Sequence, residues 1–219
     1  MRALMVSILV FLVIVTGLIS LGIGQQHDPQ PNSIQSWWEK GDAFFVQGKY
    51  DEAIECMDEV LEIDPNNAAA LANKGEALLY LGKYDEAIQS LDKAIKIDPK
   101  NTDAWGTKGQ ALYKQGKYDE ALLCMDKVIE LNPQFALAWN NKGYALIMKG
   151  EYDEAIRCFD KAIELDPQYA LAWENKGEAL YYQGKYDEAT QCFDEAIEID
   201  PKLEVAFNNK MAAQKAEVS

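Results

Sequence analysis

The chain has 219 residues, of which 48% are hydrophobic and 26% are charged. This balance is typical of a folding sequence and excludes a largely disordered chain. Its 21 basic and 36 acidic residues give a formal net charge of −15. Proteins that bind phosphate backbones need clusters of lysine and arginine, and this sequence contains none, so we expect no nucleic-acid partner. An acidic surface favours basic partner segments or serves solubility.

The first segment, residues 1–24, differs in composition from everything after it. Residues 3–24 carry no charge and are rich in Val, Ile and Leu. As a helix they would span about 33 Å, at about 1.5 Å per residue, which is enough for a bilayer core. Two interpretations remain open, an N-terminal transmembrane anchor and a cleaved signal peptide. The run is longer than the usual signal core, and Gly22-Ile23-Gly24 is a poor cleavage site.

Charges on either side of this segment predict its orientation. Arg2 precedes the apolar run, and the first lysine after it is Lys40. The positive-inside bias therefore places the N-terminus in the cytoplasm and the rest of the chain outside it. We expect a membrane-anchored protein with its main domain outside the cytoplasm, or a secreted one after signal cleavage.

Residues 25–33, QQHDPQPNS, form a polar linker with two prolines. The only histidine of the chain, His27, lies in this linker. A metal site would need further ligands nearby, and only Asp28 is close, so we interpret His27 as an exposed loop residue.

From residue 34 onward the sequence repeats with a period of 34 residues. The prolines that mark this period are Pro65, Pro99, Pro133, Pro167 and Pro201. Two columns of glycines keep the same step, Gly41, Gly75, Gly109, Gly143 and Gly177, and Gly48, Gly82, Gly116, Gly150 and Gly184. A constant period without insertions is typical of one structural unit stacked on copies of itself. The repeats are 34–67, 68–101, 102–135, 136–169 and 170–203, followed by residues 204–219, which fit one further helix.

Residues 102–135 illustrate the unit. Apolar or small residues recur every three or four positions on one face of each of two helices: Trp105, Gly109 and Leu112, then Ala121, Met125 and Val128. Gly116 is placed to end the first helix in a left-handed conformation, and Asn132-Pro133 to end the second. Asp119 and Glu120 open the second helix, where negative charge suits exposed N–H groups. Each repeat is therefore predicted to be a helical hairpin that can bury its apolar face only against its neighbours.

The columns of this unit resemble the tetratricopeptide repeat, whose pattern is W-x2-L-G-x2-Y, then A-x3-F, then P. The tryptophan column reads Trp37, Leu71, Trp105, Trp139 and Trp173; the alanine column reads Ala53, Ala87, Ala121, Ala155 and Ala189; the next reads Met57, Leu91, Met125, Phe159 and Phe193. The leucine of the pattern is replaced by Lys40, Lys74, Lys108, Lys142, Lys176 and Lys210. We expect each lysine stem to cover apolar surface while its ammonium group reaches water.

The resemblance implies an all-α fold, a right-handed superhelical solenoid of five hairpins with a capping helix at residues 204–219. It also implies that the first helices line a concave groove that binds peptides. With the first residue of each repeat counted as position 1, the groove positions are 2, 5, 6, 9 and 12. The groove residues expected on this basis are Trp38, Asp42, Phe45, Asn73, Glu76, Tyr113, Asn141, Tyr144, Asn175, Glu178, Tyr181 and Asn209.

Three kinds of side chain in this set indicate how a peptide would be held. An asparagine amide both donates and accepts hydrogen bonds and can pair with any peptide backbone, although asparagine is also a common surface residue. Trp38 and Phe45 would form an exposed aromatic contact surface. Asp42, Glu76 and Glu178 share repeat position 9 and would favour a ligand with Lys or Arg. The basic clamp with which some relatives hold a carboxylate terminus is absent, so we expect no such ligand.

The sequence predicts neither an enzyme nor a cofactor or metal site. The repeats contain no histidine that could serve as a base for Ser or Cys, and helix-opening charges such as Asp119-Glu120 need no acid–base role. The cysteines, Cys56, Cys124, Cys158 and Cys192, share one repeat position. Equivalent positions in stacked units are too far apart for a disulfide, so we expect buried filler, with a reactive exposed thiol as the lesser possibility.

The predicted function is a non-catalytic scaffold that binds an extended protein segment, preferably a basic one, outside the cytoplasm. The alternative is a structural spacer or self-associating module with no peptide ligand. Phe207 and Met211 of the last helix bear on this choice, because an apolar end could pair with another copy and form an oligomer.

Overall fold

The computed structural model describes residues 32–217, which form eleven α-helices and no strand. The first helices of the repeats are α2 (Ile34–Val46), α4 (Ala68–Tyr80), α6 (Thr102–Lys114), α8 (Ala136–Lys149) and α10 (Ala170–Tyr182). The second helices are α3 (Tyr50–Ile63), α5 (Tyr84–Ile97), α7 (Tyr118–Leu131), α9 (Tyr152–Leu165) and α11 (Tyr186–Ile199), and α12 (Glu204–Glu217) follows them.

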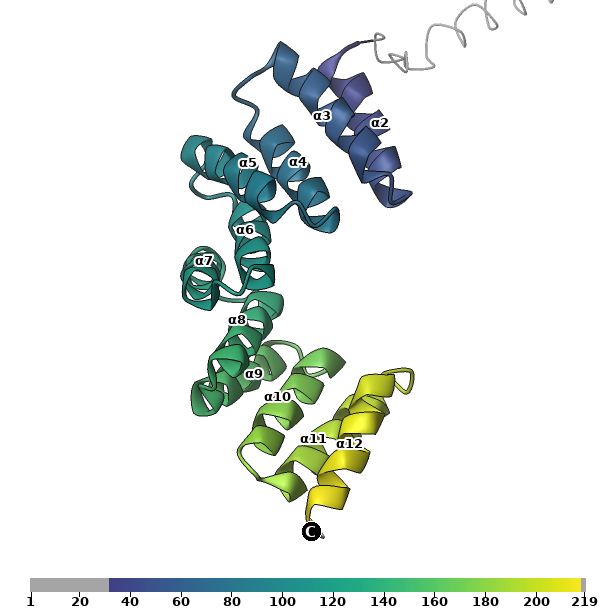
Figure 1. The fold of residues 1–219 in the computed structure, drawn as a ribbon, viewed down its shortest axis with the longest axis vertical. Coiled ribbons are helices and arrows are strands. Elements are labelled where there is room, and N and C mark those ends of the chain that lie inside the picture. Colours follow the sequence, from purple (N-terminus) through teal and green to yellow (C-terminus); the bar gives the residue numbers. More distant parts are fainter. Residues whose placement is uncertain (1–31, 218–219) are drawn as a thin grey trace, which may run out of the picture.

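Each helix packs against the next along the chain, and the stack curves so that α6–α8 are displaced to one side of both ends (Figure 1). The predicted all-α solenoid of helical hairpins is confirmed. The predicted anchor or signal, residues 1–24, lies outside the described residues, as does most of the 25–33 linker. Between residues 32 and 217, no helix is long and apolar enough to cross a membrane.

The helix ends follow from local sequence signals. Gly116 has φ +76°, the left-handed conformation predicted for the end of a first helix. Asn132 ends α7 with φ −140° and ψ 87°, away from helical values, as its position before proline requires. The side chains of Asn67 and Asn101 accept hydrogen bonds from the amides of Ala70 and Ala104 and so cap α4 and α6.

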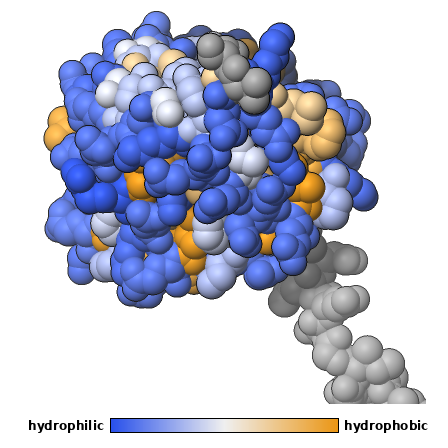
Figure 2. Space-filling model, turned by 90° about the horizontal axis from the view of Figure 1, so that it is seen from below, coloured by the Kyte–Doolittle hydropathy of each residue, from blue (hydrophilic) through white to orange (hydrophobic). Residues whose placement is uncertain are grey.

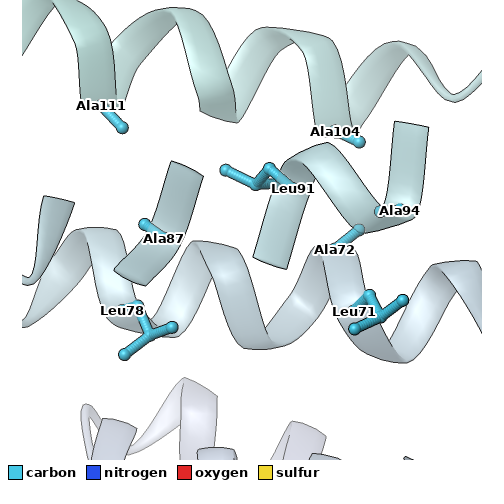
Figure 3. Packing of buried hydrophobic residues seen from close by; sticks show 8 residues of the cluster. All are labelled: Leu71, Ala72, Leu78, Ala87, Leu91, Ala94, Ala104 and Ala111. Carbon is cyan, nitrogen blue, oxygen red and sulfur yellow. The ribbon is translucent and has the colours of Figure 1, made fainter. Parts of the chain in front are cut away.

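The core is built from large side chains of each hairpin that pack against small side chains of the next repeat. Leu91 of α5 is fully buried and lies between Leu71 and Leu78 of α4 and the alanines Ala104 and Ala111 of α6 (Figure 3). In the last two repeats the column of Leu91 holds Phe159 and Phe193, which are also fully buried. The alanines let the next repeat approach closely, so each large side chain is covered by two repeats.

Ion pairs link every pair of neighbouring units in the described stack. They join a lysine Nζ to an aspartate Oδ1 of the preceding repeat, at 2.5–2.7 Å: Lys74–Asp58, Lys108–Asp92, Lys142–Asp126, Lys176–Asp160 and Lys210–Asp194. We call these the junction ion pairs. These lysine side chains remain 21–26% exposed, and the helix register adds an aspartate beside each ammonium group, a partner that was not predicted. Nearby, the indole Nε1 of Trp139 donates to the carbonyl of Pro133 at 3.0 Å.

The carboxylates that open the second helices also contact the following repeat. Asp119 lies in the first turn of α7, as predicted, and its Oδ1 is 2.8 Å from Nζ of Lys149. Asp85 and Asp153 accept hydrogen bonds at 2.8 Å from Nε2 of Gln115 and Gln183. These aspartates therefore stabilise the start of their own helix and also bind a side chain of the following repeat.

The four cysteines are free and buried, at 2–6% exposure, which confirms the interpretation as filler. Burial raises the pKa of Cys124, Cys158 and Cys192 to about 11, so these thiols stay protonated at neutral pH and are poor nucleophiles. Ser90 takes the same position in the second repeat, and its hydroxyl donates to the Leu71 carbonyl at 2.8 Å.

The last helix, α12, covers one side of the fifth repeat. Ala206 and Ala213 are fully buried, whereas Phe207 and Met211 are 56% and 52% exposed. Seen from below, the surface is mainly hydrophilic, and hydrophobic residues gather only in small separate groups (Figure 2). The predicted capping helix is present, with two large apolar side chains left exposed on it.

Candidate functional site

A pocket of about 280 Å³ lies between α6, α7 and α8. Its lining residues are Gly109, Gln110, Tyr113, Lys114, Ala121, Met125, Leu137, Asn141, Tyr144 and Ala145. The α8 residues Leu137, Asn141 and Tyr144 follow one another at steps of four and three, so they line the pocket from one face of that helix. The volume is near the lower limit of about 300 Å³ for ligand pockets, so it suits one or two side chains.

Two tyrosines form one wall of this pocket. The ring centroids of Tyr113 and Tyr144 are 5.5 Å apart, and the ring of Tyr118 also lies 5.5 Å from that of Tyr113. Burial, followed by the neighbouring Tyr144, raises the pKa of Tyr113, so its phenol is neutral at physiological pH. The wall can therefore pack against an apolar side chain while offering hydroxyl groups to polar ones.

Carboxylates lie on either side of the pocket along the groove. Glu76 of α4 and Glu178 of α10 occupy the same repeat position as Tyr144 and are half-buried. Burial raises the pKa of both, with Asp103 adding to the effect at Glu76. The charge of Glu178 also raises the pKa of Tyr113, although Glu178 does not line the pocket itself.

Glu174, one turn before Glu178, is only 5% exposed. Burial raises its pKa to about 7, the charge of Glu178 adds to this, and a hydrogen bond from Asn209 opposes it. The Nδ2 atom of Asn209 donates to Oε1 of Glu174 at 2.8 Å. A cation placed beside these carboxylates would stabilise their ionised forms.

The asparagines at repeat position 6 have different surroundings although they are the same residue. Asn175 is buried, and its Nδ2 donates to Oδ1 of Asn140 in the preceding repeat at 2.9 Å. The residue of the preceding repeat that corresponds to Asn140 is Gly106 in the case of Asn141, and it has no side chain to bond. Asn141 lines the pocket instead. Asn175 and Asn209 thus join repeats, whereas the Asn141 amide faces a space that a peptide could enter.

This difference predicts opposite results for one substitution at equivalent sites. Asn175→Ala leaves the buried amide oxygen of Asn140 without its donor and should lower the free energy of unfolding by about 1–2 kcal/mol. Asn141→Ala removes no such bond and should change it by less than about 0.5 kcal/mol. Urea denaturation followed by circular dichroism measures both. Equal losses in the two variants would contradict the assignment of Asn175 as a repeat-joining residue.

Family comparison agrees with the geometry. One tetratricopeptide repeat family model matches residues 38–102, 107–170 and 149–204, and a second such model matches residues 90–122. The chain belongs to the tetratricopeptide repeat family. No curated protein sequence matches it.

Solved structures of other tetratricopeptide repeat proteins are similar. MamA is 31% identical with a TM-score of 0.67, over 74% of this chain and 95% of MamA. YrrB, described as a TPR protein with an unusual peptide-binding site, is 26% identical with a TM-score of 0.66, over 83% of this chain and 94% of YrrB. TTC0263 from Thermus thermophilus, at 20% identity, shares the fold with a TM-score of 0.66, over 85% of this chain and all of TTC0263.

The aromatic residues of the first tetratricopeptide repeat lie apart from the pocket. Trp38 is half-buried and packs on the core cluster of Cys56, Met57 and Val60, so only part of its side chain is left for the predicted contact surface. Phe45, also half-buried, makes edge contacts with the rings of Tyr50 and Tyr80 at 5.3 and 5.5 Å.

The other predicted groove residues are spread along the tetratricopeptide stack. Asp42 is exposed on α2, and Asn73 is half-buried on α4. Tyr181 of α10 contacts the rings of Tyr182 and Tyr186. Of the predicted set, only Tyr113, Asn141 and Tyr144 meet in the pocket.

Several groove residues were absent from the predicted set, namely Gln110, Lys114, Leu137 and Glu174. A signal for Leu137 exists in the sequence, because position 2 of three successive first helices carries an aliphatic residue. Leu137, Leu171 and Val205 are 40%, 46% and 55% exposed. Glu174 stands at position 5, which the resemblance already assigned to the groove, but its hydrogen bond with Asn209 of the next unit has no signal in its own repeat.

Among residues 32–217, no group of three or more His, Cys, Asp or Glu side chains could hold a metal ion.

Proposed function

We propose that this tetratricopeptide repeat protein is a non-catalytic scaffold that binds an extended segment of another protein along its first helices. The observation that carries the proposal is the pocket at which Tyr113, Asn141 and Tyr144 meet. The Asn141 amide can pair with a peptide backbone, and the tyrosine rings can pack against one of its side chains. Protein interaction is the general role of the family, and YrrB is described as having a peptide-binding site.

Selection of peptides from a random library displayed on phage tests this proposal, with the full chain as bait in mild detergent. Enriched peptides should bind at least tenfold more weakly to Leu137→Ser/Asn141→Ala. Leu123→Ser is the matched control, because Leu123 is a 69% exposed leucine on α7 that does not line the pocket. Peptides that bind all three proteins equally, or no enrichment at all, would overturn the groove as a peptide site.

Self-association is the second candidate function, supported by the exposure of Phe207 and Met211 on α12. A self-associating chain should sediment as larger species with rising concentration, and Phe207→Ser/Met211→Ser should abolish the change. A constant sedimentation coefficient in the unsubstituted chain would reject this candidate.

Display of the repeats outside the cytoplasm remains a proposal that rests on residues 1–24, with their uncharged run after Arg2. Protease added to intact cells should digest the repeats if they are displayed at the surface of a single membrane. Protection until the membrane is opened would place them inside it.

A further inference from the structure

Three groove carboxylates are shielded from water in the first helices: Glu174 is buried, and Glu76 and Glu178 are half-buried. At the junction ion pairs each aspartate has a lysine within 2.7 Å. Within the described part of the chain, no ion pair involves the groove set Glu76, Asp103, Glu174 and Glu178. No lysine or arginine lowers the pKa of Glu76, Glu174 or Glu178 either. Asp103 is exposed, but Glu76, Glu174 and Glu178 carry a desolvation cost when ionised, which the hydrogen bonds from Tyr182 to Glu178 and from Asn209 to Glu174 offset in part and a ligand cation would reduce further.

The two groups of carboxylates lie on opposite sides of the apolar pocket. Glu76 and Asp103 come from α4 and α6, and Glu174 and Glu178 from α10, whereas the pocket lies between α6 and α8. Glu76 and Glu178 occupy the same repeat position as Tyr144, so all three face the same side of the stack. The charge on this face is thus arranged around one central apolar pocket.

The repeat geometry sets the distance between these features. With neighbouring helices about 10 Å apart, the pocket centre is about 15 Å, or one and a half repeats, from the position of Glu76 and of Glu178. An extended chain advances about 3.3 Å per residue, so four residues cover most of this distance.

We propose that the bound segment carries one large apolar side chain in the pocket and a lysine or arginine about four residues to each side of it. This inference rests on the proposed function and specifies the chemistry of its partner. The apolar residue packs against Tyr113, Tyr144 and Leu137, and the flanking cations pair with Glu76 on one side and Glu178 on the other. Lys114 at the pocket rim opposes the same cations and weakens binding.

Fluorescence anisotropy with defined peptides tests the inference on the full chain. The parent probe is an eleven-residue peptide of Gly and Ser with Phe at position six and Lys at positions two and ten. It should bind at least tenfold more tightly than the probe with Glu in place of both lysines, and than the probe with Ser in place of Phe. Its affinity should fall as salt is added, because the charges are partly screened.

Protein variants then locate the charges. Glu76→Gln and Glu178→Gln should each weaken the parent probe about threefold or more without affecting a probe that has Gln in place of Lys. Lys114→Gln should strengthen the parent probe. Glu62→Gln on α3 is the matched control, because Glu62 is exposed on a second helix, outside the groove set. Circular dichroism confirms that each variant is folded.

The outcomes separate this inference from the proposed function. If the parent probe binds no better than the glutamate probe, or if both glutamine variants bind it normally, the inference is overturned. Library peptides that still depend on Leu137 and Asn141 would then leave the groove as a peptide site with different specificity. If those peptides fail as well, the proposed function falls with it.

Discussion

Replacing Gly177 by alanine is expected to lower the free energy of unfolding by about 2 kcal/mol, although alanine is the better helix former. A Cβ atom at this position would lie 2.5 Å from Cε1 and 2.8 Å from Cδ1 of Phe193. The Phe193 ring is fully buried and has no room to withdraw. Overpacking of this kind costs about 1–3 kcal/mol, and a contact this short belongs at the upper end, so it outweighs the gain of about 1 kcal/mol in helix propensity.

Gly106→Ala is the matched control, because this glycine is also inside a first helix but a Cβ there would meet nothing within 4 Å. It should raise the free energy of unfolding by about 1 kcal/mol. Urea denaturation measured by circular dichroism gives both values. In a Phe193→Ala background, Gly177→Ala should lose most of its cost. If Gly177→Ala and Gly106→Ala shift stability in the same direction, the packing argument fails.

The second large effect concerns pH and Glu174. The folded-state pKa of this carboxyl is raised from 4.5 to about 7, so between these values the folded protein binds more protons than the unfolded chain. The stability that this group contributes is present below about pH 4.5 and is lost as the pH rises through 7. At about 1.4 kcal/mol per pKa unit, the loss is on the order of 3 kcal/mol.

Glu174→Gln removes this titration and keeps an amide oxygen that can accept from Asn209. The variant should therefore gain stability over the unsubstituted protein between pH 5 and pH 8, and the difference should be larger at pH 8. Urea denaturation at both pH values measures it, with the exposed Glu62→Gln as control. A Glu174→Gln variant that gains nothing at pH 8 would show that the carboxylate is adequately solvated.

The fold was predictable because its signals are local and repeated. Gly116 and Asn132 end their helices through their own backbone preferences, whatever the neighbouring repeat contains. The junction ion pairs were missed although they recur at a constant separation, as in Lys142 with Asp126. Recognising them requires the register between successive helices, which the period alone does not provide.

The site was predictable only in part, because its residues depend on what the preceding repeat supplies. Asn141 and Asn175 occupy equivalent positions, yet one lines the pocket and the other is buried against Asn140. The difference follows from Gly106, which lacks the side chain that Asn140 provides one repeat later. Trp38 shows the same limit, since its burial against the first core cluster could not be inferred from its position in the column.

The junction ion pairs have a consequence for how such a chain can change in length. Removal of residues 102–135 as a whole unit would bring Lys142 to the register of Lys108, within reach of Asp92. Addition of a whole unit would preserve the same pairing. A gene encoding these repeats can therefore gain or lose complete copies by recombination and still encode a stack with an ion pair between every two neighbouring repeats. The groove side chains differ from copy to copy, so each such event also changes which segment the protein can hold.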